Sequence, residues 1–491
     1  MSSGTTSAAP AAGPELLLAL DRSSARPLRA QLEDGLRGLV RAGRLPAHER
    51  LPATRALAVD LGVSRRLVVD AYAQLLAEGY LVARHGSGTF VAETAGAPPA
   101  QAIEPARRRL SFDFFPGYPD LASFPRAAWL RATRETLREA PDRAFGYPEP
   151  TGAPALRTAL AAHLRRVRGV EADPRAIVIC AGAAQGFALL ARVLDRPTVA
   201  VEDPCLPRHR DILSAGGARL VPLPVDDHGA RVGELPALAA REGTIDAVVV
   251  TPAHQSPIGV ALSPQRRAAL LAWAGETGAL VFEDDYDAEY RYDRQPLAAM
   301  QGLAPEQVIY MGTVSKTLAP ALRLGWLVLP ARFVDAVAEA KWLADSGCPT
   351  LDQLALARML DSGAYDRHLR TARRRYRARR DALVHALDRH IPGARVTGVA
   401  AGLHAIVRLP RAVDGVAVAR AARALSVGVY PLGQGYMEPR AVDDGFVLGY
   451  ANLAEPAIEE GIRRFARALD DVDPSPPAPP VPAKDGGAIA R

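Results

Sequence analysis

Short apolar runs alternate with amphipathic segments over most of this chain, from Phe112 to about Asp470. Runs of four to six residues are typical of buried strands, and the segments between them are long enough for helices. Strands that alternate with helices build parallel sheets, because each crossover carries the chain back over one face. We therefore expect an α/β domain with a mostly parallel sheet over residues 111–470. Its predicted strands are Ala176–Ala181, Thr198–Glu202, Ala247–Thr251, Leu280–Glu283 and Val308–Met311.

The whole chain has 491 residues, which is long for one domain, so two or three domains are expected. Apolar residues make up 48% and charged residues 23%, as in ordinary globular proteins. Residues 1–25 predict a disordered lead, 92–110 a linker rich in Ala, Pro, Glu and Arg, and 471–491 a disordered tail. Residues 26–91 remain as a second, smaller domain.

Composition also indicates the compartment. The start of the chain has no apolar secretory segment, and no apolar run approaches the roughly 20 residues that a membrane helix needs. Cys180, Cys205 and Cys348 are odd in number and widely spaced, which predicts neither a disulfide framework nor a metal site. We expect a cytoplasmic protein without membrane contact and without a bound metal.

Residues 26–91 have the pattern of a small helical unit closed by a hairpin. A first helix carries leucines at helical spacing and ends at Gly43. Thr54 is a candidate N-cap of a short second helix, and Ser64 is a candidate N-cap of a third helix. Leu81–Arg84 and Thr89–Val91 predict short strands on either side of a glycine-rich turn. Two helices, a tight turn and a hairpin predict a winged helix-turn-helix. The segment holds ten Arg and six acidic residues, a net charge of +4 that suits a phosphate backbone.

The residues of this unit resemble the GntR family of bacterial regulators over about 65 positions without gaps. The resemblance lies in Leu51-Pro52-x-x-Arg55, in Leu61-Gly62-Val63-Ser64-Arg65, in Glu78-Gly79-Tyr80-Leu81 and in Gly86-Ser87-Gly88-Thr89-Phe90-Val91. It implies binding to double-stranded operator DNA. Arg65 and Arg66 at a helix start would read base edges, although the family usually has a small polar residue in place of Arg66. The other expected DNA contacts are Arg55 and Ser64 on phosphate and His85 and Gly86 in the minor groove.

Lys316 stands out because only three of the chain's 60 basic residues are lysines. A guanidinium stays protonated, whereas a buried lysine can lose its proton and bond to an aldehyde as a Schiff base. Lys316 lies within Thr313-Val314-Ser315-Lys316-Thr317, with Arg323 seven residues downstream. This setting predicts a catalytic or cofactor-binding lysine rather than a surface residue.

The second domain resembles fold-type I pyridoxal-phosphate enzymes of the aspartate aminotransferase group over roughly 350 residues. The resemblance implies pyridoxal 5'-phosphate as cofactor, with Lys316 on its aldehyde, Asp284 on the ring nitrogen and Tyr286 on the phenolic oxygen. The phosphate would bind the amides of Ala183 and Ala184 at a helix start, together with Thr313, Arg323 and, from a neighbouring subunit, Tyr147.

Three positions depart from an aminotransferase. Leu206 replaces the expected ring-stacking aromatic, and Ser256 replaces the asparagine before Pro257; the preceding His-Gln is typical of the regulator subfamily. Val447 falls where an arginine would grip a substrate carboxylate, and Arg208 is the remaining candidate to hold such an effector group.

Arg370–Arg380 contains seven arginines on a predicted helix. One interpretation is a solvated face with contacts to acidic neighbours four residues away, and the other is a second DNA-contacting surface.

Together the two domains resemble the MocR subfamily of GntR regulators. The resemblance implies a homodimeric, pyridoxal-phosphate-binding transcription factor whose effector is pyridoxal phosphate itself or an amine or amino acid reacting with it. Control of vitamin B6 or amino-acid metabolism would follow, with little or no productive transamination. The alternative is an aminotransferase with an appended DNA-binding module.

Overall fold

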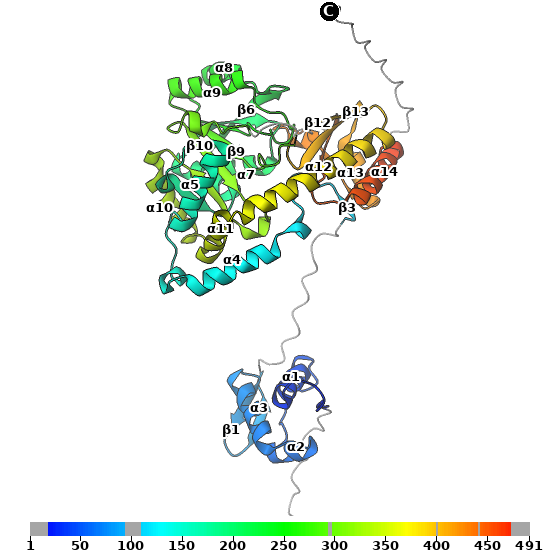
Figure 1. The fold of residues 1–491 in the computed structure, drawn as a ribbon. Coiled ribbons are helices and arrows are strands. Elements are labelled where there is room, and N and C mark those ends of the chain that lie inside the picture. The colour runs from blue at the N-terminus through cyan, green and yellow to red at the C-terminus, as the bar shows by residue number, and fades with distance from the viewer. Residues whose placement is uncertain (1–17, 94–109, 293–296, 399–400, 440–441, 473–491) are drawn as a thin grey trace, which may run out of the picture. The chain divides into compact units, whose positions relative to one another are not determined.

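A computed structural model of the protein describes residues 18–93, 110–292, 297–398, 401–439 and 442–472 (Figure 1). The chain divides into two compact units at residues 108 and 109. Each unit has its own hydrophobic core.

The first unit is three helices closed by a two-stranded hairpin. Its elements are α1 (Leu28–Arg41), α2 (Thr54–Asp60), α3 (Arg65–Ala77), β1 (Leu81–Arg84) and β2 (Gly88–Val91). Its core gathers one face of each helix, including Leu32, Leu57 and Val68. The prediction for Ser64 is confirmed, because its side chain accepts a hydrogen bond from the Leu67 amide at the start of α3. The prediction for Thr54 is wrong: Thr54 is the first helical residue, and Ala53 precedes α2 without a side-chain cap.

The second unit is built on an eight-stranded sheet in the order β4-β11-β10-β9-β8-β5-β6-β7. All five predicted strands are present, with bounds that differ by at most two residues. They are β4 (Ile177–Cys180), β5 (Thr198–Asp203), β8 (Ala247–Val250), β9 (Leu280–Asp285) and β10 (Val308–Thr313), and β5, β8, β9 and β10 pair in parallel. Three strands were not predicted: β6 (Arg219–Asp226), β7 (Gly229–Ala230) and β11 (Gly325–Val328), and β11 is antiparallel to both β10 and β4.

Helices cover both faces of this sheet, which explains why most residues of its strands are apolar. Successive residues of β9 point to opposite faces: Val281 joins a core with α9 (Pro264–Thr277), and Phe282 joins a core with α6 (Ala183–Val193) and α10 (Val334–Asp345). A further core packs α5 (Pro154–Arg168), α11 (Thr350–Asp361) and α12 (Ala364–His390) against β4 and β10. No described helix is long and apolar enough to cross a membrane.

A smaller sheet, β12-β13-β16-β15, forms the carboxyl-terminal part of the unit. Its strands are β12 (Arg395–Thr397), β13 (His404–Asp414), β15 (Tyr430–Pro431) and β16 (Val442–Gly449). Two helices, α13 (Gly415–Ala424) and α14 (Glu455–Val472), lie beside it, and α12 runs from the large sheet toward them (Figure 1).

The arginine-rich stretch lies on α12 and matches the solvated face of the first interpretation only in part: three of its seven arginines are exposed, and others contact the same unit. Arg373 donates to the Glu289 carbonyl at 2.7 Å, and Arg379 forms an ion pair with Asp120 at 3.0 Å. Arg380 is buried with its guanidinium 5.2 Å from the Tyr292 ring centre. These side chains therefore hold neighbouring segments of the same unit together.

Candidate functional site

The predicted cofactor residues meet at the carboxyl edge of the large sheet. Asp284 lies at the end of β9, Thr313 at the end of β10, and Ala183 follows β4 at the start of α6. Parallel strands bring their carboxyl ends to one edge, where open α/β sheets place their ligands. Segments that lie more than 100 residues apart in the sequence thus share one site.

The Lys316 amine lies beyond the end of β10 and is half-buried. Burial lowers its pKa, while the negative charges of Asp287 and Asp284 oppose that shift. The chain crosses it closely at Gly117, where an added Cβ would lie 3.3 Å from Lys316 Nζ. A lysine with a lowered pKa in a confined space suits a nucleophilic amine.

Asp284 is buried, and its Oδ2 has no hydrogen-bond partner among the described residues. Burial raises the pKa of this carboxyl to about 7, and the neighbouring Asp285 adds to the shift. The imidazole of His209 lies beside it, with Nδ1 3.7 Å from Oδ2, but burial lowers the pKa of His209 to about 4 and leaves it neutral at pH 7. A buried carboxylate without a cationic partner is costly, and a protonated pyridine nitrogen would supply that partner.

Tyr286 lies two residues after Asp284, and its hydroxyl contacts His254. It donates to the His254 carbonyl at 3.1 Å and lies 3.2 Å from His254 Nδ1. The next residue, Gln255, donates to the Glu202 carboxylate and to the Pro204 carbonyl. The His-Gln pair of the sequence therefore fixes the loops after β5 and β8 around the site.

The predicted phosphate-binding end of the site lies at the start of α6. Gly182 precedes α6 with a left-handed φ of 87°, and no side chain caps the helix start. An added Cβ on Gly182 would lie 3.3 Å from the Arg323 guanidinium. Arg323 also donates to the Ala181 carbonyl. The amides of Ala183 and Ala184, the helix dipole and this guanidinium together suit an anion.

Thr313, which was predicted to contribute a hydroxyl to phosphate binding, forms hydrogen bonds within the protein in this structure. Its hydroxyl lies 3.1 Å from the Leu324 carbonyl and 2.9 Å from the Ser315 hydroxyl, so it binds within its own loop. Ser315 was not singled out from the sequence, although its hydroxyl lies one residue from Lys316. It is the second hydroxyl available for a phosphate.

Tyr147 and Arg208 do not line this pocket within one chain. Tyr147 is 87% exposed, with its ring centre 6.5 Å from that of Trp342. Arg208 is exposed in the first turn of α7 (Pro207–Ala215). The sequence predicted Tyr147 to act on a neighbouring subunit, and its exposure leaves it free to do so.

The position expected for a carboxylate-binding arginine is apolar. Val447 is buried on β16, opposite Ile406 of β13, and both belong to a small cluster with Leu432. Leu206, in place of the ring-stacking aromatic, is exposed. His209, one helical turn later, approaches Asp284 instead; sequence reasoning missed it because no motif marked it.

In the first unit, the predicted DNA contacts lie around the start of α3. Arg55, Ser64, Arg65 and Arg66 are exposed, and the Ser64 oxygen accepts the capping bond at 3.2 Å, which leaves its hydroxyl hydrogen free to donate. Arg66 is 91% exposed, with Asp70 3.9 Å away. Acidic residues elsewhere in the unit are engaged with α1: Glu33, Asp34 and Glu78 all form ion pairs with Arg37. These three carboxylates are therefore paired with Arg37, whereas Asp70 is an acidic side chain within ion-pair distance of an arginine at the start of α3.

The hairpin presents His85 and Gly86 at an exposed turn, where Gly86 has a left-handed φ of 72°. Two arginines that the sequence reading passed over flank this turn. The Arg50 Nε lies 3.2 Å from the position of an added Cβ on Gly88, and Arg84 lies 4.9 Å from the Phe90 ring centre. Both extend the basic surface along the hairpin.

Comparison with known proteins accounts for both units. Residues 28–91 match the gntR family of bacterial regulatory proteins, and residues 117–433 match the class I and II aminotransferases. A relative from Rhizobium meliloti, "Probable rhizopine catabolism regulatory protein MocR", is 35% identical over 478 residues, 92% of this chain and 96% of that protein. The chain belongs to the MocR-type GntR regulators.

One further relative matches almost the whole chain, and one solved structure matches about three quarters of it. The "HTH-type pyridoxine biosynthesis transcriptional regulator PdxR" of Corynebacterium glutamicum is 34% identical over 93% of this chain and 99% of that protein. The crystal structure of Pyrococcus horikoshii kynurenine aminotransferase matches the second unit alone, with a TM-score of 0.69 and 28% identity over 74% of this chain and 91% of that one. The protein is thus a DNA-binding transcriptional regulator whose second unit has the pyridoxal-phosphate-binding aminotransferase fold.

Proposed function

We propose that this regulator binds operator DNA as a homodimer and that pyridoxal phosphate at Lys316 controls this binding. The observation that carries the proposal is the pocket at the sheet edge. It combines a lysine of lowered pKa, a buried carboxylate that lacks a partner, and a helix start with an arginine. Each of these features meets one requirement of the cofactor: its aldehyde, its ring nitrogen and its phosphate.

The effector is pyridoxal phosphate itself rather than an amino acid. An amino-acid ligand brings a carboxylate, and the position expected to bind it is the apolar cluster of Val447, Ile406 and Leu432. Loss of a charge-assisted contact costs roughly 1.5–3 kcal/mol of binding free energy. The name of PdxR, a regulator of pyridoxine biosynthesis, supports a link to vitamin B6 metabolism.

The homodimer rests on Tyr147 and on the fold. Domains of the fold-type I aminotransferase class commonly dimerise, and Tyr147 is a large aromatic side chain that is exposed in the single chain. In the dimer, Tyr147 would donate to the phosphate held by the partner. Two winged helices would then bind two half-sites of one operator.

The test is a titration of pyridoxal phosphate into protein bound to operator DNA, with the operator first selected from a random pool. We expect the cofactor to change operator affinity by about 5–150-fold, the range of ordinary allosteric coupling. Lys316→Ala should remove this response while keeping basal DNA binding, and Lys484→Ala should keep both. An operator affinity that is independent of the cofactor would overturn the proposal.

A further inference from the structure

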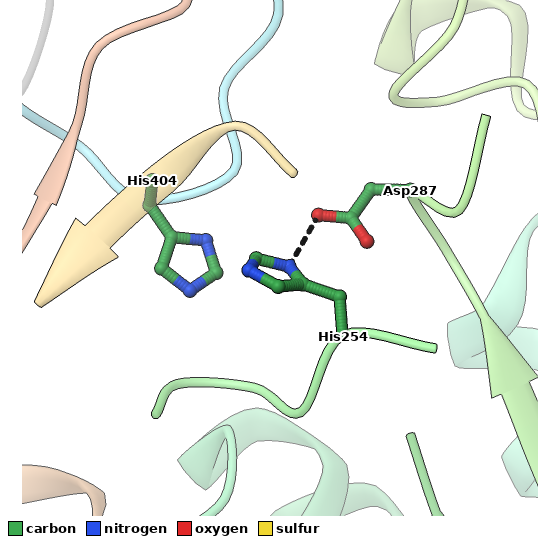
Figure 2. Close-up of side chains that lie close together, drawn as sticks. All are labelled: His254, Asp287 and His404. Atoms are coloured by element: carbon green, nitrogen blue, oxygen red, sulfur yellow. Dashed lines mark hydrogen bonds and ion pairs between the residues drawn. The ribbon is translucent and has the colours of Figure 1, made fainter. Parts of the chain in front are cut away.

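Three buried side chains from distant parts of the second unit converge beside the cofactor pocket (Figure 2). His254 lies in the loop after β8, Asp287 in the loop after β9, and His404 at the start of β13 in the smaller sheet. Each is at most 2% exposed, and one potential ligand atom from each lies within 4.8 Å of the others. The rings of His254 and His404 lie next to each other with their centres 4.9 Å apart and their planes tilted by 45°.

Hydrogen bonds assign one nitrogen of each imidazole. His254 Nδ1 lies 3.0 Å from Asp287 Oδ2 and donates to it, while His404 Nε2 donates to the Pro257 carbonyl at 3.0 Å. The other two nitrogens, His254 Nε2 and His404 Nδ1, are buried without a hydrogen-bond partner among the described residues. In the neutral tautomers that these bonds select, both carry a lone pair.

The Lys316 amine interacts electrostatically with Asp287, but the two groups form no ion pair. Within ion-pair distance, the described residues give the Asp287 carboxylate only His254 as a partner. A buried carboxylate and two buried lone pairs each carry a desolvation cost, which a shared cation would remove. The backbone is also packed tightly here, since a Cβ on Gly402 would lie 2.5 Å from Asp287 Oδ2.

We propose that His254 and His404 bind a divalent transition-metal ion, with Asp287 orienting His254 and balancing the charge. Histidines that bind metals donate their second N–H to a carboxylate or a backbone carbonyl, and the two histidines here show one of each. Imidazole nitrogen favours zinc and similar ions over magnesium or calcium. The remaining coordination positions are open to water or to a small molecule.

This ion would join two parts of the second unit. His254 and Asp287 belong to loops at the carboxyl edge of the large sheet, and His404 belongs to the smaller sheet. Because His254 also contacts the Tyr286 hydroxyl at 3.2 Å, the ion would stiffen one wall of the cofactor pocket. The site was not predicted from the sequence, since no two of its three residues have the spacing of a metal motif.

The experiment uses the full-length protein without a histidine tag, stripped with a chelator and then dialysed against micromolar zinc. We expect one zinc ion per chain, and a visible d–d absorption when cobalt replaces zinc. The Lys316→Ala variant should bind the same amount, which separates this site from the cofactor.

His254→Gln and His404→Gln should each weaken zinc binding at least tenfold, and the gentler Asp287→Asn should weaken it about 10–100-fold. His163→Gln is the matched control, because His163 is also a buried histidine of the same unit and lies 3.7 Å from a carboxylate, that of Asp366. The His163→Gln variant should bind zinc as tightly as the unchanged protein. Circular dichroism and thermal unfolding verify that each variant is folded. Failure of the folded wild-type protein to bind zinc, or equal binding by all folded variants, would overturn the proposal.

Discussion

At the scale of single residues, the two described lysines occupy opposite environments. Lys341 is fully buried, and its amine forms an ion pair with Asp345 at 2.7 Å, which suits a structural role. Lys316 has no ion pair among the described residues, is half-buried, and interacts electrostatically with the unpartnered carboxylate of Asp284. Only Lys316 has the setting for covalent chemistry.

Replacement of Lys316 by alanine should therefore abolish the visible absorption of the protein-bound cofactor, because the covalent bond to its aldehyde requires this amine. The measurement is an absorption spectrum of purified protein after incubation with pyridoxal phosphate and removal of the excess. Lys484→Ala serves as the control and should keep the band. A band that survives in Lys316→Ala would assign the covalent bond to another amine.

Asp284 should make the stability of the cofactor-free protein depend on pH. Its pKa is about 7 in the folded protein against 3.8 in the unfolded chain, so the folded state holds a proton that the unfolded state has lost. As pH rises from about 4 to about 7, the free energy of unfolding should fall by up to about 1.4 kcal/mol per pH unit from this carboxyl. Above pH 7 this contribution should level off.

The comparison that isolates Asp284 is Lys316→Ala against Lys316→Ala with Asp284→Asn. Urea unfolding from pH 5 to pH 8 measures the free energy of unfolding of both proteins. As pH rises, the variant with Asp284→Asn should become more stable relative to Lys316→Ala alone, because asparagine does not titrate. Other buried carboxyls with raised pKa values, such as Glu283, are present in both proteins. Parallel pH profiles would contradict the assigned pKa.

The site residues divide by how they can be recognised. Lys316, Asp284 and Gly182 stand in local motifs, so the sequence predicted where they would meet. His209, His254 and His404 approach the site through tertiary packing, and a histidine in a sequence does not reveal which distant carboxylate it will face. Ser315 was overlooked because Thr313 two residues earlier fitted the same role.

At the scale of elements, α3 and the hairpin carry the DNA-binding hypothesis. Arg65 at the start of α3 should read a base, whereas Arg55 in α2 should contact a phosphate. Arg65→Ala should cost roughly 1–3 kcal/mol on operator DNA and relax specificity at one base position. Arg55→Ala should weaken binding to all sequences alike and lower the salt slope by about one.

Binding isotherms on operator and random DNA over a range of salt concentrations measure both effects. Arg463→Ala on α14 is the control, because Arg463 is an exposed arginine of the second unit that pairs with Glu460. It should leave both affinities unchanged. Equal losses for Arg65→Ala on operator and on random DNA would refute its role as a base reader.

Elements with strong local patterns were predicted well. The five predicted strands are mostly apolar runs, and the α3 cap follows from one serine before a helix. β11 (Gly325–Val328) was missed because it follows closely on the Arg323 loop. Some arginines of α12 were misjudged because charge alone does not show that Asp120 and the Glu289 carbonyl lie against the helix.

At the scale of the whole molecule, regulation and catalysis predict different behaviour. With Val447 in place of a carboxylate-binding arginine and Leu206 in place of the stacking aromatic, a substrate carboxylate would lack its usual partner and the cofactor ring would be held less firmly. Supplied with common amino acids and 2-oxoglutarate or pyruvate, the protein should show no sustained formation of keto acids. Turnover near the roughly 1–1000 per second of ordinary enzymes would instead favour an aminotransferase with an appended DNA-binding unit.

The central claim is that cofactor binding and operator binding are coupled, and coupling free energies are reciprocal. The most direct test measures the dissociation constant of pyridoxal phosphate by its absorption, with and without saturating operator DNA. We predict that operator DNA changes this constant by the same factor by which the cofactor changes operator affinity, and that random DNA changes it much less. A cofactor affinity that is identical with and without operator would contradict the claim, because the coupling free energy between cofactor binding and operator binding would then be zero.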